Sequence, residues 1–369
     1  MIQFSVAILS GCIALFINLG LIPLIIKFAH HFKLYDLPDK RKIHTGLIPR
    51  LGGSGIFLSF IITIILTYII LYIFNSTDLL LQSKPRFYAL FSGIFLIHIF
   101  GLYDDLRNVK APLKLFFQAL AAAIVAGGGY LIHSLTIPYL GTINLGLFAY
   151  PVTIIWIVGI SNAINLIDGM DGLAGGICAF AALSMGIIAL IQGQILIVVL
   201  CFALFGSITG FLFYNYPPAK IFMGDSGSLF LGFSLSVFPL MGISKASAFG
   251  TLIVPITLLL IPIMDTAGAI LRRIRQKRPI HSPDKEHIHH KLLDMGLSER
   301  QILSVIYGIS FYLGVVSITS VVLPKEINVY LIMVVWIGSM LGYWFLSYIN
   351  AKRHLSRAEE EAGAEEKSS

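Results

Sequence analysis

The sequence predicts an all-α, polytopic membrane protein with about eleven transmembrane helices. Of its 369 residues, 57% are hydrophobic and only 12% are charged, whereas a soluble domain carries about 25% charged residues. Helices satisfy their own backbone hydrogen bonds in lipid, which makes them the usual membrane-spanning element. A transmembrane β-barrel would alternate polar and apolar residues, so the long unbroken apolar runs argue against one.

About eleven apolar segments approach or reach the length of about 20 residues that a membrane-spanning helix needs. They are residues 5–26, 51–74, 87–103, 113–133, 147–164, 173–191, 195–214, 228–241, 249–271, 302–323 and 329–349. The first has no basic residues ahead of it and no small-residue cleavage site after it, so we expect an uncleaved helix and not a signal peptide. We predict a single transmembrane domain over residues 1–350 and a charged, disordered tail over residues 351–369.

The distribution of lysine and arginine predicts the orientation of these helices. An odd number of spans places the two termini on opposite sides of the membrane. Nearly all basic residues then fall on one side, and Lys84, Arg86, Lys245 and Lys325 are left on the other. Because cytoplasmic loops are enriched in Lys and Arg, we expect the N-terminus outside and the C-terminus in the cytoplasm. This distribution also explains the net charge of +7 without a nucleic-acid partner.

Several carboxylates occur at the ends of apolar segments, all on the predicted cytoplasmic side. They are Asp104, Asp105, Asp168, Asp171 and Asp225. Charged groups beside a bilayer are costly and usually functional, so these acids predict a site for a divalent cation and a phosphorylated substrate. A sixth acid, Asp265, lies inside an apolar segment, where we expect it to pair with Arg272 or Arg273.

The first motif joins two acids to two lysines. Asp104 and Asp105 end the third predicted span, and Lys110 and Lys114 follow. Residues four apart share one face of a helix, so both lysines could bind one anion. The motif predicts a general base beside phosphate-binding lysines, and the alternative is a solvated, charged helix end.

The second motif places four oxygen-bearing side chains at steps of three residues. They are Asn162, Asn165, Asp168 and Asp171. A step of three keeps side chains on one side of a helix, and their oxygen atoms suit a hard cation such as Mg²⁺. The alternative is an Asn/Asp/Gly turn that only joins two spans.

Asp225 and the first cytoplasmic loop supply two further candidates. Asp225 lies in a glycine-rich segment at a helix start, which favours anion binding, although a simple helix cap has the same pattern. Phe222 just before it could stack on a nucleobase. The first loop carries His44 and Arg50 ahead of a Gly-Gly pair, and its alternative is an ordinary basic loop.

A histidine cluster, His287, His289 and His290, lies in the long loop before the tenth predicted span. No cysteine accompanies these histidines and their spacing differs from that of structural zinc sites. We therefore expect them to bind a diphosphate rather than zinc.

In combination, these motifs resemble those of the polyprenyl-phosphate N-acetylhexosamine-1-phosphate transferases. The resemblance extends from about residue 35 to residue 297. Residues 49–53, 102–105, 162–172, 222–228 and 287–290 stand in the order that this family shows. Within the family, the sequence looks most like the bacterial enzymes that transfer GlcNAc-1-phosphate to undecaprenyl phosphate. Phospho-MurNAc-pentapeptide transferases are a poorer fit.

The resemblance implies a role for each matching residue. Asp225, with Asn165, would bind Mg²⁺ on the nucleotide diphosphate, and Mn²⁺ is an acceptable substitute. Asp104 or Asp105 would deprotonate or orient the lipid phosphate. The implied catalytic residues are Asp104, Asp105, Asp168 and His290. The implied substrate-binding residues are Lys114 for a phosphate, Asp171 and Phe222 for the uracil, His287 and His289 for the sugar phosphate, and Asn162, Asn165, Arg50 and His44 as further contacts.

The implied partners are UDP-GlcNAc, undecaprenyl phosphate and the lipid bilayer, and a homodimer is compatible with this assignment. The expected location is the bacterial cytoplasmic (inner) membrane, with the site facing the cytoplasm and starting synthesis of an envelope polysaccharide such as teichoic acid or O-antigen. Two alternatives belong to other classes. A cation-coupled transporter would place acids near the bilayer midplane, where this chain has almost none, and a scaffold protein would not need the full set of acids.

Overall fold

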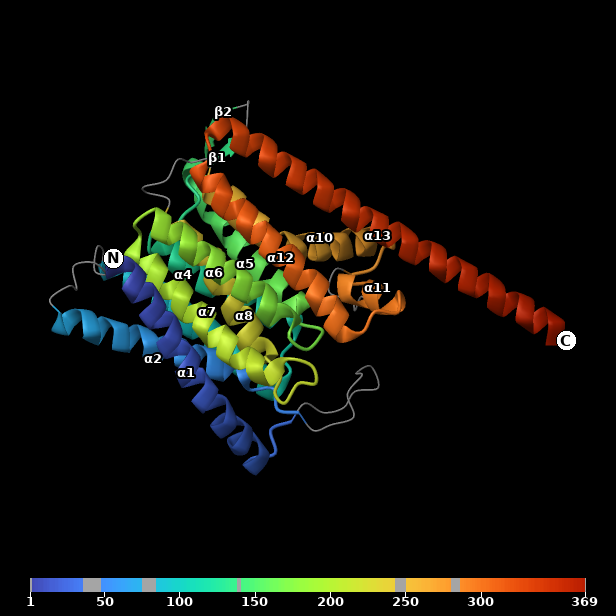
Figure 1. Ribbon diagram of the computed structural model, residues 1–369, viewed down its shortest axis with the longest axis horizontal. Helices are drawn as coiled ribbons and strands as arrows, with labels where there is room; N and C mark the ends of the chain where they lie inside the picture. Colours follow the sequence, from blue (N-terminus) through green and yellow to red (C-terminus); the bar gives the residue numbers. More distant parts are fainter. Residues whose placement is uncertain are drawn as a thin grey trace.

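The computed structural model describes residues 2–35, 48–74, 84–137, 141–242, 250–279 and 286–368. The described chain forms a bundle of helices lying side by side (Figure 1). Two short strands pair in antiparallel fashion as a hairpin at one end of this bundle, and α11 lies towards the other end. The predicted all-α, polytopic architecture is confirmed.

The elements follow one another along the chain with short connections. They are α1 (Ile2–His31), α2 (Gly52–Ile73), α3 (Lys84–Arg107), α4 (Ala111–Gly127), β1 (Ser134–Ile137), β2 (Gly141–Asn144), the 3₁₀ turn η2 (Gly146–Phe148), α5 (Ala149–Ile167), α6 (Leu173–Ile191), α7 (Ile195–Asn215), α8 (Gly224–Met241), α9 (Gly250–Leu258), α10 (Leu260–Arg275), α11 (Ile288–Asp294), α12 (Glu299–Val322) and α13 (Lys325–Ser368).

Most predicted spans correspond to helices that are long enough to cross a membrane. Within the described residues, 8 helices pass on length and composition, or up to 9 if one bent pair counts as a single span. Helix α4 is shorter, and α8 has 18 residues that lie mostly inside the bundle. The number of crossings and the orientation of the termini therefore stay predictions.

Two predicted spans differ from the structure for local reasons. The span at 113–133 ends as a helix at Gly127, because Gly128 and Gly129 follow and Gly129 has a φ of +92°. The span at 249–271 is broken at Leu259 into α9 and α10, which meet at 80°. Pro262 has no N–H to donate to the carbonyl four residues before it, which weakens a continuous helix here.

The predicted disordered tail was also wrong as to secondary structure, because α13 continues to Ser368. The tail is rich in Ala, Glu, Lys and Arg. These residues have the highest intrinsic helix propensities, so a segment can be both strongly charged and helical.

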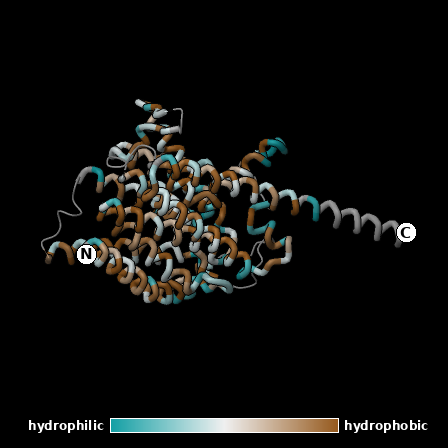
Figure 2. The backbone as a smooth tube through the Cα atoms, turned by 45° about the horizontal axis from the view of Figure 1, so that its top comes forward, coloured by the Kyte–Doolittle hydropathy of each residue, from teal (hydrophilic) through white to brown (hydrophobic). Residues whose placement is uncertain are grey.

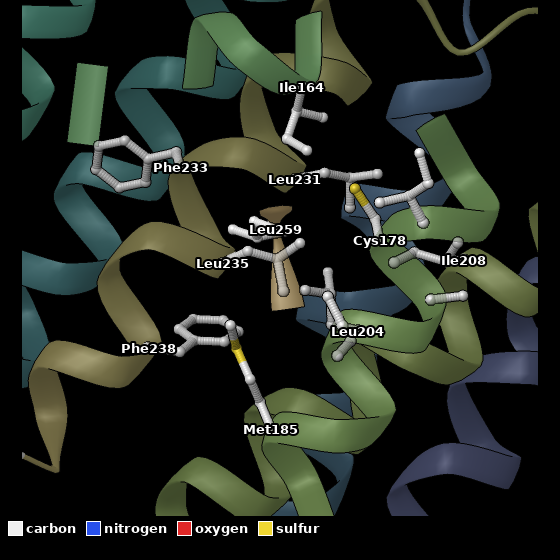
Figure 3. Close-up of a cluster of buried hydrophobic side chains, with 14 of the residues drawn as sticks. Ile164, Cys178, Met185, Leu204, Ile208, Leu231, Phe233, Leu235, Phe238 and Leu259 are labelled. Atoms are coloured by element: carbon white, nitrogen blue, oxygen red, sulfur yellow. The ribbon is translucent and has the colours of Figure 1, made fainter. Parts of the chain in front are cut away.

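Helix α8 forms the centre of the core. Its side chains Phe230, Phe233 and Phe238 have no exposed surface. Figure 3 shows residues from four neighbouring elements converging on α8: Ile164 of α5, Cys178 and Met185 of α6, Leu204 and Ile208 of α7, and Leu259 beside α10. The core therefore holds in place the helix whose first turn carries Asp225.

The outer surface of the bundle is largely apolar. Hydrophobic residues predominate along the helices in Figure 2. Phe16 of α1, Ile155 of α5 and Phe213 of α7 are 68%, 71% and 68% exposed. Water would disfavour such a surface, whereas lipid accepts it, so the fold is that of a multi-pass membrane protein.

The start of α8 is held close to two other helices by glycines. A Cβ added at Gly53 of α2 would lie 2.2 Å from the Gly227 nitrogen, and one at Gly101 of α3 would lie 2.7 Å from the Ser226 Cα. The chain before α2 also pairs with the chain before α8, since the Phe222 N–H donates to the Pro49 carbonyl and the Gly53 N–H to the Met223 carbonyl, both at 2.8 Å. Only glycine permits these backbone contacts.

Replacement of Gly53 by alanine should therefore lower the stability of the protein. The added methyl group meets backbone atoms, which cannot move aside as a side chain can, and overpacking of this kind costs about 1–3 kcal/mol. The apparent unfolding temperature of the detergent-solubilised protein measures the effect. Gly338→Ala in α13 is the control, because nothing lies within 4 Å of the added atom. An equal effect of both substitutions would contradict the packing argument.

Candidate active site

The charged centre of the molecule lies where α3, α4, α5 and α8 meet. The Lys114 ammonium is 2.5 Å from Oδ2 of Asp104 and 2.9 Å from Oδ2 of Asp225. Asn165 donates a hydrogen bond of 2.7 Å to Oδ1 of Asp225. Asp104 is 1% exposed, so its charge needs the nearby cation. Four residues from separate predicted motifs thus form one cluster, which we call the acid cluster: Asp104, Lys114, Asn165 and Asp225.

Asp105 has a different position from its neighbour Asp104. Its two oxygens accept hydrogen bonds from the backbone N–H groups of Asp225 at 2.7 Å and Ser226 at 3.0 Å. These N–H groups lack partners within the helix because they belong to the first turn of α8. A Cβ at Gly224 would lie 2.6 Å from this carboxylate. Asp105 therefore fixes the start of α8, and the geometry favours Asp104 as the acid that faces the cluster.

The two asparagines of the second motif also separate. Asn165 bonds to Asp225 and to the Ser228 hydroxyl, the latter at 2.8 Å. Asn162 instead donates to the Gln118 side chain at 2.6 Å and to the Val158 carbonyl at 2.8 Å. Asn165 is thus part of the acid cluster, whereas the hydrogen bonds of Asn162 join α5 to α4.

Asp168 follows the last residue of α5, close to these acids. Desolvation raises its pKa to about 7, the charges of Asp225, Asp105 and Asp171 add to the shift, and Arg50 opposes it. Arg50 precedes α2, and its carbonyl lies 2.5 Å from the place of a Cβ on Gly224. Asp168 and Arg50 therefore lie beside the acid cluster. His44 falls outside the described residues.

Asp171 lies in a second network, next to the first. It is 5% exposed, and its Oδ2 accepts a hydrogen bond of 2.9 Å from the Ala219 N–H. Asn215 accepts from the Gly172 N–H at 2.9 Å, and the Tyr307 hydroxyl donates to the Gly172 carbonyl at 2.7 Å. Asn215 and Tyr307 were not predicted. Asn215 could have been noticed as an amide ending a very apolar helix, whereas nothing in the sequence marks Tyr307.

The histidine cluster is carried by α11 and the residue before it. His289 is 2% exposed, and neither of its ring nitrogens has a hydrogen-bond partner within the described residues. Its ring packs on Gly169, since a Cβ there would lie 2.9 Å from Cε1. Burial, then the neighbouring His290 and His287, lower its pKa to about 4. The His290 ring lies 4.2 Å from that of His289. The turn after α5 thus contacts both the acids and the histidines.

The expected arginine partner of Asp265 was wrong. Oδ2 of Asp265 lies 2.7 Å from Nδ1 of His287, and Oδ1 accepts a hydrogen bond of 2.8 Å from the Ile288 N–H. Arg272 instead lies 3.4 Å from the Glu286 carboxylate. An arginine two turns away along one helix was the nearest cation in the sequence, but α11 brings a closer partner from another segment.

The pKa of Asp168 leads to a testable pH dependence. An unfolded Asp titrates near pH ~4, whereas folded Asp168 titrates near 7. Between about pH 4 and about pH 7 the folded chain therefore binds more protons, and rising pH reduces stability. Asp168→Asn cannot ionise, so its apparent unfolding temperature in chelator should exceed that of the wild type increasingly up to about pH 8. A constant difference at every pH would refute ionisation of Asp168 inside the folded protein.

Comparison with known proteins agrees with this arrangement of residues. The profile of Glycosyl transferase family 4 matches residues 87–243, which include the whole acid cluster. A Bacillus subtilis protein, "Probable undecaprenyl-phosphate N-acetylglucosaminyl 1-phosphate transferase", is 39% identical over 326 residues, covering 88% of this chain and 86% of its own length.

Two more distant relatives have related names. The "Undecaprenyl-phosphate alpha-N-acetylglucosaminyl 1-phosphate transferase" of Yersinia pestis is 31% identical, with coverage of 76% of this chain and 75% of its own. The "Decaprenyl-phosphate N-acetylglucosaminephosphotransferase" of Mycobacterium leprae is 31% identical, with coverage of 84% and 81%. With the acid cluster and the histidine cluster in the same fold, the chain belongs to glycosyl transferase family 4.

Proposed function

We propose that this protein transfers GlcNAc-1-phosphate from UDP-GlcNAc to undecaprenyl phosphate, with release of UMP. The product, undecaprenyl-diphosphate-GlcNAc, would be the first lipid-linked intermediate of an envelope polysaccharide. The names of the relatives in Bacillus subtilis and Yersinia pestis support the substrates. The basic residues around the site support a cytoplasmic location for it.

The observation that carries the proposal is the sharing of one ammonium group by two carboxylates. Lys114 contacts Asp104 and Asp225 at the edge of an apolar bundle. The reaction brings together two anionic phosphates, so it needs positive charge at the place where they meet. A lysine held between carboxylates, together with a cation that the carboxylates bind, supplies that charge.

The donor set fits a magnesium ion. Mg²⁺ prefers oxygen ligands and usually takes one or two carboxylates, with phosphates and water completing its shell. Asp225 offers a carboxylate at the helix start, and Oδ2 of buried Asp104 makes no well-aligned hydrogen bond within the described residues. Those residues contain no group of three or more His, Cys, Asp and Glu arranged as a complete metal site, which is consistent with ligands shared with a substrate.

Asp225 would hold the ion, with Asn165 fixing the carboxylate through Oδ1. Bound Mg²⁺ would neutralise charge on the diphosphate and make its β-phosphorus easier to attack. Mn²⁺ has the same preference for oxygen ligands.

The proposed reaction is one direct displacement. An oxygen of the lipid phosphate forms a bond to the β-phosphorus of UDP-GlcNAc, while the bond from that phosphorus to the bridging oxygen breaks and UMP leaves with the oxygen. Asp104 would accept the proton of a monoprotonated lipid phosphate or orient its oxygen. Lys114, which lies between the two acids, would stabilise the phosphate oxygens as they approach. Asp168 beside the cluster would contribute to the same proton balance.

Other residues would select the two ends of the donor. Asp171 and Phe222 lie on the side of the second network and would hold the uracil. His287, His289 and His290, together with Arg50, would contact the sugar phosphate. Hydrogen bonds and charge from several segments would orient the donor for attack.

A transfer assay tests this function directly. Purified protein in detergent receives radiolabelled UDP-GlcNAc, undecaprenyl phosphate and Mg²⁺, and we expect a labelled lipid product that chelator abolishes. Asp225→Asn should lower kcat by at least about 100-fold, the range for losing one preorganised electrostatic contact. It should also raise the Mg²⁺ concentration needed for half-maximal rate.

The control is Glu326→Gln, an exposed acid in the first turn of α13, which should keep the wild-type rate. Labelled product from UDP-MurNAc-pentapeptide and none from UDP-GlcNAc would replace the proposed donor. Full activity of Asp225→Asn at low Mg²⁺ would refute the metal assignment.

The contact of His289 with Gly169 gives a second prediction. A Cβ at Gly169 would lie 2.9 Å from the His289 ring, and that ring is buried against His290. Gly169→Ala should therefore displace the ring and lower kcat, by up to about 100-fold if the shift approaches 1 Å. Gly308→Ala in α12, where nothing lies within 4 Å, is the matched control. Equal rates in the two variants would separate His289 from the reaction.

A further inference from the structure

We infer that Asp265 is a positioning residue for the transfer reaction: it orients the His287 ring and fixes the start of α11. The inference rests on the proposed function, since it assigns how one part of that site is held. No pattern in the sequence links Asp265 to the histidine cluster, because the two are separated by the loop after α10.

Asp265 uses both carboxylate oxygens to hold two consecutive residues. Oδ2 lies 2.7 Å from Nδ1 of His287, and Oδ1 accepts from the Ile288 N–H at 2.8 Å. Asp265 is 1% exposed and His287 is 6% exposed. A buried carboxylate persists only where hydrogen bonds or opposite charges compensate its desolvation. This two-point contact compensates it and also fixes a ring and a backbone at once.

The contact determines which atom of His287 is left for another partner. An ionised carboxylate oxygen only accepts hydrogen bonds, so Nδ1 must carry the shared hydrogen. The hydrogen bond made by one ring nitrogen sets the state of the other. From the described residues no hydrogen bond reaches Nε2 of His287. Asp265 therefore holds the ring so that Nε2 can meet a phosphate or sugar oxygen in one orientation.

The same contact sets the position of the histidines that follow. The rings of His287 and His289 are parallel within 2°, with centroids 6.1 Å apart. His289 in turn packs on Gly169, the residue after Asp168. A continuous series of contacts thus runs from Asp265 through His287 and His289 to the turn beside the acid cluster.

The charged neighbours leave Asp265 to His287. Arg272, on the same helix as Asp265, lies 3.4 Å from the Glu286 carboxylate and donates to the Glu286 carbonyl at 3.1 Å. Glu286 immediately precedes His287, so this second ion pair also holds the chain that enters α11. His289 and His290 are the other titratable groups beside the ring.

A double-mutant cycle with purified protein tests this role. Asp265→Asn keeps the size of the side chain but removes the charge, and His287→Gln removes Nδ1. We expect Asp265→Asn to lower kcat by about 10- to 100-fold, as for other groups that orient a functional histidine, with little change in either KM. Because Asp265 acts through His287, the double variant should be no slower than His287→Gln alone. Glu326→Gln should match the wild type.

Losses that multiply in the double variant would overturn the inference, as would Asp265→Asn with wild-type kcat and only a lower unfolding temperature. If Asp265→Asn does not fold, His287→Asn decides the question. Its amide nitrogen replaces Nδ1 and keeps the bond to Asp265, but nothing replaces Nε2, so we expect a folded, slow protein; wild-type kcat would overturn the inference. A wild type inactive with UDP-GlcNAc would refute the proposed function instead, and the same cycle would then be measured with the donor that it does use.

Discussion

One ammonium group between two carboxylates is the interaction on which the polar end of this protein depends. Asp104 comes from α3, Lys114 from α4 and Asp225 from α8, so three helices meet at a single point of charge. Without a cation, the two acids would repel each other beside a low-dielectric bundle. The apolar core holds α8 where this contact requires it. Packing and electrostatics therefore agree on the same arrangement of helices.

Two neighbouring contacts make this arrangement specific. Asp105 binds the free N–H groups at the start of α8 and so fixes Asp225 from the backbone side. Asp265 binds the start of α11 in a comparable way and brings His289 onto Gly169. In both cases a buried carboxylate accepts backbone hydrogen bonds at a helix start, where N–H groups have no partner within the helix. Acids of the same type thus divide into those that hold the site and those that face it.

The sequence by itself determined the fold class, most of the helices and the membership of the acid cluster. Lipid leaves the backbone few solutions, so a long apolar run can be assigned to a helix with little information from elsewhere. An acid at the end of such a run is rarely there for packing, which is why Asp104, Asp168 and Asp225 could be selected before their contacts were known. Asn165 followed from its spacing to Asp168.

Tertiary structure decided what depends on residues far apart in the chain. The choice between Asp104 and Asp105 follows from the position of α8, and the partner of Asp265 follows from the return of α11; neither is encoded in a local period. The break at Leu259 also differed from expectation, because hydropathy does not register the missing N–H of Pro262. Local composition determines which segments become helices, since each satisfies its own backbone. Which carboxylate meets which partner is decided by packing, since a hydrogen bond depends on distances that only the folded chain sets.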